Sequence, residues 1–332
     1  FLKEVLRMKK FRIIALALLL ILLPSMLFAQ AKPIVLRLAE THPKGYPTEL
    51  GDEEFARLVK ERSNGRIIVE VYPGSQLGEE KAVIEQVQFG AIDITRVSIS
   101  PVAAFVPKLN AFQMPYLYRD SDHMWKVLKG DIGMELLASL EPFGFIGLGW
   151  FEAGARSFYN SKKPVYTPAD LKGMKIRVQE SELMLGLVRS FGAIPTPMPY
   201  GEVYSGLQTG VVDGAENNPP SYYSASHYEV AKYYTLDEHT MVPEIIIGSK
   251  ISLGRLSKAD QDLIKKAAMD AIDYQRAQWD AYVKVSMDKV KEAGCTIIPI
   301  PDKTEWMKAV EPMYKQQPKE IQDLVARIRA VK

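Results

Sequence analysis

The sequence is poor in cysteine and histidine, the residues that most often build metal centres and covalent cross-links. Cys295 is the single cysteine among 332 residues, so the chain cannot form an intramolecular disulfide or supply a cysteine cluster for zinc or iron–sulfur. The four histidines show no second His or Cys at metal-ligand spacing; they are His42, His123, His227 and His239. We therefore expect no metal site and no cofactor.

Motifs of catalysis are also missing. The chain has no P-loop, no Gly-x-Ser-x-Gly and no HExxH. Ser286 and Lys289 have the spacing Ser-x-x-Lys, but they lie in the middle of a helical pattern among charged residues. Gly144, Gly147 and Gly149 lie inside an apolar strand pattern and do not form the dinucleotide-binding fingerprint. The sequence gives no reason to expect an enzyme.

Positive charge is scarce outside the first 31 residues. The whole chain carries 42 Lys and Arg against 40 Asp and Glu, a net charge of +2. Residues 1–31 carry five basic residues and one acidic residue, a charge of +4, which leaves −2 for residues 32–332. A nearly neutral body does not favour nucleic-acid binding, so we expect no nucleic-acid partner.

The basic excess precedes an apolar run, Ile13–Leu23. A basic segment, this run and the small residues of Ala29-Gln-Ala31 follow one another in the order of a secretory signal peptide. An uncleaved membrane anchor is the alternative, but it needs about 20 apolar residues. We expect residues 1–31 to comprise a signal peptide with an upstream extension, residues 1–7, before Met8, and cleavage near Ala31 to release an exported protein.

Two stretches of the mature region repeat an alternation of strand and helix patterns. Residues 35–98 predict strand, helix, strand, helix and strand, the order typical of an α/β sheet covered by helices. Residues 174–213 repeat this alternation. Apolar residues at spacings of three and four then predict a helix from Ser257 to about Glu292, which would be about 54 Å long. We predict an α/β fold of two closely joined halves, with a long helix spanning both.

Arginines stand out at the ends of predicted strands. Arg177 lies at the C-terminal end of one strand, Arg156 follows another, and Arg96 shares a strand face with Ser98. Each could by itself be a structural ion-pair residue. Ligands of α/β sheets bind beyond such strand ends, and a guanidinium matches a carboxylate with two parallel hydrogen bonds. Several arginines facing one cleft would therefore suit the capture of a small carboxylate.

Longer motifs around these residues resemble the solute-binding subunits of tripartite ATP-independent periplasmic (TRAP) transporters. The resemblance covers the mature region from Leu36 to the end. It is carried by Tyr72-Pro-Gly-Ser-Gln-Leu-Gly-Glu-Glu80, Leu171-Lys-Gly-Met-Lys-Ile-Arg177, Gly192-Ala-Ile-Pro-Thr-Pro-Met198 and, most specifically, Glu202-Val-Tyr-Ser-Gly-Leu-Gln-Thr-Gly-Val-Val-Asp-Gly-Ala-Glu-Asn217.

The resemblance implies a two-lobed periplasmic solute-binding fold of the Venus-flytrap type, which closes on its ligand by a hinge motion. Lobe I would comprise residues 32–153 plus about 243–282. Lobe II would comprise residues 154–242 plus about 283–332, with the ligand cleft between the lobes. No catalysis is needed for this function.

The resemblance also assigns roles to individual residues. Arg177 would pair with the ligand carboxylate through two hydrogen bonds, and Arg156 would contact the same anionic end. Asn217 would hydrogen-bond the ligand, Tyr200 would line the pocket, and Glu180 stands where sialate-binding relatives have an amide. Lobe I would contribute residues at or beside contact positions: Thr41, His42, Glu80 and Ser98, with Arg96 turned to the same side as Ser98.

The implied ligand is a small carboxylate. The acidic, Asn and Ser acceptors of the same segments suggest that it also carries hydroxyl groups. The segments 39–43, 96–100 and 215–218 resemble those of uronate-binding members, so we predict a hexuronate such as D-glucuronate or D-galacturonate. A C4-dicarboxylate or 2-keto acid on the same scaffold, an exported enzyme acting on sugar acids, and a sensory receptor are the alternatives. The resemblance further implies a periplasmic monomer that delivers its ligand to membrane permease subunits.

Overall fold

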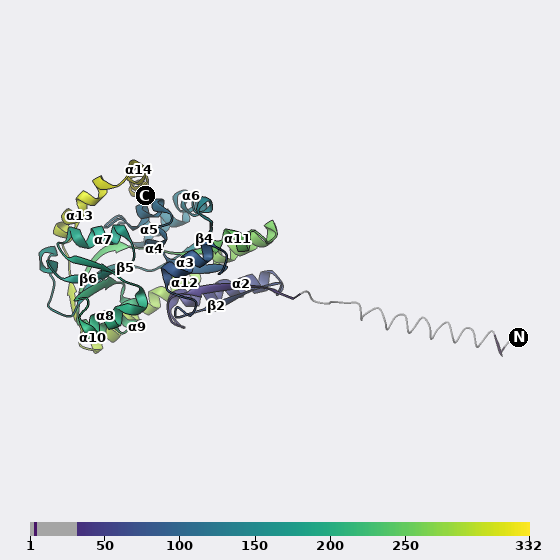
Figure 1. Ribbon diagram of the computed structural model, residues 1–332, viewed down its shortest axis with the longest axis horizontal. Helices are drawn as coiled ribbons and strands as arrows, with labels where there is room; N and C mark the ends of the chain where they lie inside the picture. Colours follow the sequence, from purple (N-terminus) through teal and green to yellow (C-terminus); the bar gives the residue numbers. More distant parts are fainter. Residues whose placement is uncertain (1–2, 5–31) are drawn as a thin grey trace.

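The computed structural model describes residues 3–4 and 32–332 of the chain (Figure 1). The predicted signal peptide lies outside the described residues, apart from Lys3 and Glu4. Among the described residues, none of the helices combines the length and the apolar character that a membrane span requires.

The first sheet has the strand order β2-β1-β3-β10-β4. Its first three strands are parallel, and β10 runs antiparallel between β3 and β4; the strands are β1 (Ile34–Glu40), β2 (Ile67–Tyr72), β3 (Ile94–Ser98), β4 (Phe145–Phe151) and β10 (Glu244–Ser249). Strands covered on both faces are apolar throughout. This explains Ile245, Ile246 and Ile247, three consecutive residues that are all fully buried. We refer to this sheet and the helices packed on it as lobe I.

Along the chain, most helices of lobe I connect successive strands of its own sheet. They are α2 (Pro47–Arg62), α3 (Glu80–Gln88), α4 (Ile99–Val102), α5 (Ser121–Lys129), α6 (Asp131–Ala138) and α11 (Lys250–Leu253), with short 3-10 helices η2 (Pro107–Gln113) and η3 (Glu141–Phe143). Helix α4 begins directly after β3, and Glu80 at the start of α3 accepts a hydrogen bond from the Ser98 amide at the C-terminal end of β3. Both helix starts therefore lie at the sheet edge where ligands of α/β folds bind.

The second sheet has the order β11-β9-β5-β8-β6-β7 and forms lobe II. Its strands are β5 (Ala155–Asn160), β6 (Lys175–Val178), β7 (Ile194–Pro197), β8 (Gly214–Asn217), β9 (Tyr233–Met241) and β11 (Thr296–Pro299). Its helical segments are η4 (Pro168–Leu171), α7 (Glu182–Ser190), η5 (Tyr200–Glu202), α8 (Val203–Thr209), α9 (Pro219–Ser224), α10 (His227–Val230) and α13 (Thr304–Gln316). The two sheets confirm the predicted α/β fold with two halves.

Helix α12 (Lys258–Glu292) joins the lobes and confirms the predicted long helix. The Ser257 side chain caps its start by accepting a hydrogen bond from the Asp260 amide, 3.1 Å away. The helix packs against α2 and β4 in lobe I and against α9 in lobe II. The chain also passes from one lobe to the other between β4 and β5 and again between β9 and β10. Several chain segments therefore form the hinge.

Helix α14 (Lys319–Ala330) differs from the predicted division of the chain, which placed it in lobe II. It packs on η2 of lobe I and lies near α5 (Figure 1). Nε2 of His123 bonds the carbonyl oxygen of Ile328 at 3.0 Å, and Arg327 pairs with Glu135 at 2.7 Å. The sequence shows that α14 is amphipathic, but this pattern does not say which lobe covers the apolar face. The C-terminal segment is therefore a further connection between the lobes.

Candidate functional site

A narrow cavity lies between the two lobes, and its walls leave about 20 Å³ of free volume. Its walls come from the sheet edges where β1, β6 and β8 end and where the antiparallel strands β5 and β10 begin. Lobe I contributes Thr41, His42, Glu80 and Glu244, and lobe II contributes Arg156, Arg177, Gln179, Tyr200, Asn217, Asn218 and Ser221.

Arg177 is the cavity cation without an acidic partner among the described residues. It lies on β6, and its side chain is 2% exposed. Its Nε and Nη2 atoms donate to the carbonyl oxygen of Met198 at 2.9 and 2.7 Å. These bonds fix the guanidinium from one side and leave Nη1 and the second N–H of Nη2 for another acceptor. Burial lowers the pKa of Arg177, so an anion bound here would stabilise the charged form.

Arg156 on β5 is held by an acidic partner. Nε lies 2.5 Å from Oε2 of Glu216, and Nη2 lies 2.9 Å from Oε1 of the same carboxylate. Its remaining terminal nitrogen, Nη1, donates to Oδ1 of Asn217 at 3.0 Å. Burial alone would raise the pKa of Glu216, but the charge of Arg156 and the hydrogen bonds from His239 and Arg156 outweigh it and lower the pKa to about 2. Arg156 therefore has a fixed orientation in the cavity wall, and Glu216 largely neutralises its charge.

His239 lies behind this pair, fully buried on β9. Its Nδ1 is 2.8 Å from Oδ2 of Asp237, and its Nε2 is 3.4 Å from Oε2 of Glu216. Burial alone would lower the pKa of His239, but the two carboxylates outweigh it and raise the pKa to about 9. Asp237 is in turn fixed by the amide of Phe158, which donates to Oδ1 at 3.0 Å. The arginine is thus supported by a buried chain of alternating charges.

The lobe I wall of the cavity is acidic. The Ser98 amide donates to Oε1 of Glu80 at 2.9 Å, and Arg96 donates to Oε2 of Glu244 at 2.6 Å. Burial and the nearby charge of Glu244 raise the pKa of Glu80 to about 8. Burial, together with Arg156, lowers the pKa of His42 to about 3, so this cavity residue is a neutral imidazole.

Contacts across the cleft hold the two lobes together. The hydroxyl of Tyr46 in lobe I is 2.9 Å from Oγ of Ser221 in lobe II. The Gly201 amide donates to Oε2 of Glu79 across the same gap at 3.4 Å. His42 stacks on Tyr46 with their ring centroids 3.8 Å apart. The structure therefore shows the closed arrangement of the lobes.

The structure brings most of the predicted site residues together around this cavity. Those that line it are Thr41, His42, Glu80, Arg156, Arg177, Tyr200 and Asn217. Ser98 is not among the lining residues: its side chain caps α4, accepting from the Ser100 amide at 3.4 Å, while its own amide holds Glu80. Ser98 thus contacts the site through its backbone.

Arg96 and Glu180 are not placed in the cavity wall. Arg96 is fully buried inside lobe I, where it is paired with both Glu40 and Glu244. Glu180 is only partly buried, and Gln179 occupies the cavity wall instead. Strand β6 ends at Val178 and the chain turns there, so the alternation of side chains does not extend to Glu180.

Four lining residues were missed by sequence reasoning: Gln179, Asn218, Ser221 and Glu244. Asn218 directly follows a predicted contact residue, and Ser221 lies one turn further along α9, so the same motif contained a signal for both. Glu244 begins β10 immediately after the chain crosses between the lobes. A polar residue at a lobe crossing could have been expected to lie at the cleft.

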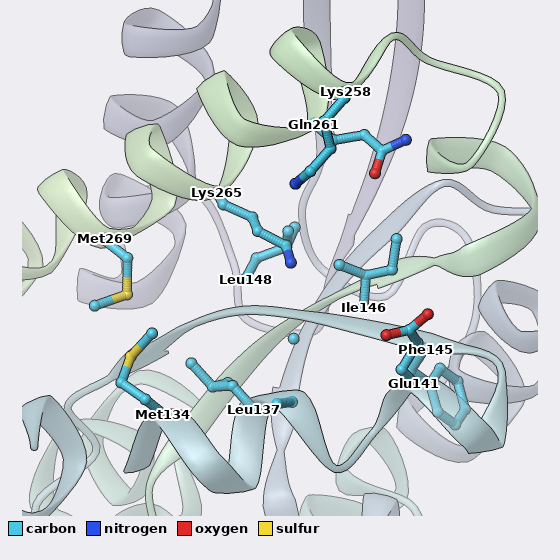
Figure 2. A pocket seen from close by; sticks show the side chains of 12 residues that line it. Met134, Leu137, Glu141, Phe145, Ile146, Leu148, Lys258, Gln261, Lys265 and Met269 are labelled. Carbon is cyan, nitrogen blue, oxygen red and sulfur yellow. The ribbon is translucent and has the colours of Figure 1, made fainter. Parts of the chain in front are cut away.

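A second hollow lies within lobe I, between α6, β4 and α12 (Figure 2). Lys258 and Lys265 extend over it, while Leu137, Ile146 and Leu148 form an apolar floor (Figure 2). None of the predicted site residues lines it, and it is not between the lobes. The cavity between the lobes is therefore the candidate site.

Two α/β lobes, several hinge connections and a charged cavity between them define a solute-binding protein. The model of the family DctP, bacterial extracellular solute-binding protein family 7, matches residues 38–320, and the chain belongs to this family of TRAP-type solute-binding proteins. Proteins of this family are extracytoplasmic transport components that bind small carboxylates and work with membrane permeases.

Solved structures with the same fold contain sugar acids. A TRAP periplasmic solute-binding protein from Bradyrhizobium sp. BTAi1, in complex with D-galacturonate, is 44% identical, with a TM-score of 0.87 over 89% of this chain and 99% of that chain. Another, from Pseudomonas putida F1 with bound D-glucuronate, is 41% identical, with a TM-score of 0.88 over 90% and 98%. A solute-binding protein of Chromohalobacter salexigens is 41% identical over 83% of this chain and 82% of its own length.

Proposed function

We propose that this protein captures a hexuronate, D-glucuronate or D-galacturonate, in the cavity between its lobes and delivers it to the permease subunits of a TRAP transporter. The observation that carries this proposal is the state of Arg177: a buried cavity cation whose terminal N–H groups have no acidic partner among the described residues. A ligand carboxylate supplies that partner, with two charge-assisted hydrogen bonds. Structures at 37–44% identity that contain uronates support the same ligand class.

The rest of the cavity suits the hydroxyl groups of a sugar acid. Asn217, Asn218 and Ser221 offer amide and hydroxyl groups on the lobe II side, and Glu80 and Glu244 offer acceptors on the lobe I side. A ligand that contacts both walls stabilises the closed arrangement and shifts the hinge equilibrium towards it. Tyr46 and Ser221, already bonded across the cleft, complete the closure. No bond of the ligand has to break, so the protein acts by binding alone.

The chain is proposed to act in the periplasm as a monomer. A signal peptide cleaved near Ala31 would direct it there, as the sequence predicts. A C4-dicarboxylate or 2-keto acid remains the alternative ligand, and a sensory role the alternative use. Reconstitution with the permease separates transport from sensing, because only transport moves labelled uronate into vesicles.

A thermal-shift panel tests the ligand. Purified protein, unfolded and refolded to remove carried-over ligand, is heated with D-glucuronate, D-galacturonate, succinate or pyruvate. At 100 times the Kd, a ligand adds about 2.7 kcal/mol of stability, which such a panel detects readily. Stabilisation by a uronate supports the proposal. Stabilisation by succinate or pyruvate with none by either uronate would replace it with the alternative.

A further inference from the structure

The two walls of the cavity carry opposite charges. The lobe II wall contains Arg177, whose charge has no carboxylate partner among the described residues, and Arg156, which Glu216 neutralises. The lobe I wall contains Glu80 and Glu244. Arg96 binds Glu244, but it also binds Glu40, so one cation serves two carboxylates. The lobe I wall therefore keeps an excess of negative charge facing the cationic wall.

Each of the two lobe I carboxyl groups has one oxygen committed and one open. The Ser98 amide occupies Oε1 of Glu80, and Arg96 occupies Oε2 of Glu244. Among the described residues, neither Oε2 of Glu80 nor Oε1 of Glu244 has a hydrogen-bond partner. Either oxygen can accept a hydrogen bond from a ligand hydroxyl group, and Glu80 can also donate one when it holds a proton.

We propose that Glu80 and Glu244 form a charge filter that accepts the hydroxyl end of a monocarboxylate and rejects a second ligand carboxylate. This inference rests on the proposed function and extends it to the choice between uronates and dicarboxylic sugar acids. A ligand carboxylate bound to Arg177 sets the orientation, so its other end meets the acidic wall. A hydroxyl there donates to an open oxygen. A carboxylate there is placed against like charge in a closed site, which costs several kcal/mol.

The electrostatics of Glu80 agree with this arrangement. Burial and the charge of Glu244 raise the pKa of Glu80 to about 8, against the lowering effects of the Ser98 amide and the two cavity arginines. Near neutral pH Glu80 is therefore mostly protonated, because the wall does not stabilise a second negative charge beside Glu244; above pH 8 it is mostly ionised. A further anion would have to enter against this repulsion, or with a proton.

A neutralising substitution tests the filter. Glu80→Gln keeps an oxygen that accepts from the Ser98 amide, so above pH 8 the substitution removes the charge and preserves the fold. Titration calorimetry at pH 9, where Glu80 is mostly ionised, measures D-glucuronate, D-gluconate and D-glucarate on the wild type and the variant. D-glucarate is D-gluconate with its terminal alcohol oxidised to a second carboxylate. We expect the wild type to bind D-glucarate about 100-fold or more weaker than D-glucuronate, and the variant to gain at least about 10-fold for D-glucarate.

Glu85→Gln is the matched control, since Glu85 is an exposed carboxylate on the same helix, α3, and does not line the cavity. Its rejection of D-glucarate should equal that of the wild type. Glu244→Gln should act in the same direction as Glu80→Gln. Wild-type binding of D-glucarate as tight as that of D-glucuronate overturns the filter. So does a Glu80→Gln variant that keeps D-glucuronate binding and gains nothing for D-glucarate. Failure of the wild type to bind either uronate would instead overturn the proposed function.

Discussion

Arg156 and Glu216 form a two-point ion pair within the wall of the cavity, with Nε–Oε2 at 2.5 Å and Nη2–Oε1 at 2.9 Å. Both side chains are buried, and the pair leaves Nη1 of the arginine for Asn217. Arg177, the second cavity arginine, bonds a backbone carbonyl instead of a carboxylate. The two arginines therefore have different tasks: one is fixed by the protein, and the other is available to the ligand.

Glu216→Gln should strongly destabilise the protein and weaken ligand binding. The substitution leaves the buried charge of Arg156 without its partner, and breaking a buried pair in this way costs about 3–5 kcal/mol. Denaturant unfolding measures the loss, and calorimetry measures the affinity. Glu229→Gln, at an exposed position of α10, serves as control and should change stability by less than about 0.5 kcal/mol. A Glu216→Gln variant as stable as this control would contradict the role given to the pair.

The buried imidazolium of His239 should make stability depend on alkaline pH. Its pKa is about 9 in the folded protein and 6.5 as the ordinary value. Between these values the folded state holds a proton that the unfolded chain has released, so the free energy of unfolding falls as pH rises. This contribution is fully present below pH 6.5 and is lost by about pH 9. Unfolding of the wild type and of His239→Gln should therefore differ most near pH 6, and the difference should shrink by roughly 1 kcal/mol per pH unit. Curves that stay parallel from pH 6 to 9 would show that the imidazole is neutral.

Tyr46→Phe should weaken ligand binding modestly and mainly through faster dissociation. The substitution removes the cross-cleft bond to Ser221, while the ring keeps its stacking on His42. A bond of this kind contributes about 0.5–1.5 kcal/mol, so the Kd should rise by roughly 2- to 10-fold. Stopped-flow kinetics separates the two rate constants. Tyr72→Phe, which loses only a surface bond to Glu70, is the control and should bind as the wild type does. Equal dissociation rates for both variants would contradict the role of Tyr46 in holding the lobes closed.

Ile328→Ala should loosen lobe I, even though the residue lies at the C-terminal end of the chain. Ile328 is fully buried on α14, and truncating such a side chain costs about 2–5 kcal/mol. Because α14 packs on η2, hydrogen exchange should rise in residues 107–113 before it rises in lobe II. Faster exchange confined to α13 and the lobe II sheet would place the C-terminal helix on the other lobe.

Local patterns in the sequence were enough to predict the alternating strands and helices, the long helix and the strand-end position of Arg177, because these depend on neighbouring residues. Pairing between distant segments was not predictable in the same way. Arg96 has the strand position of a cleft residue, but Glu244 from a strand 148 residues later reaches its guanidinium. The amphipathic pattern of α14 likewise predicts that one face of the helix is buried, but it does not indicate which lobe covers that face.

The most direct test of the central claim is calorimetric titration of D-glucuronate and D-galacturonate into Arg177→Ala and Arg177→Lys. Two charge-assisted hydrogen bonds of about 1.5–3 kcal/mol each are lost in the alanine variant, so binding should weaken by about 100-fold or more. Lysine keeps the charge without the planar fork, so it should restore only part of the affinity. Unchanged thermal unfolding of the ligand-free variants would show that the fold is intact. Uronate affinity within about threefold of the wild type in the alanine variant would contradict the assignment of Arg177 as the carboxylate-binding residue.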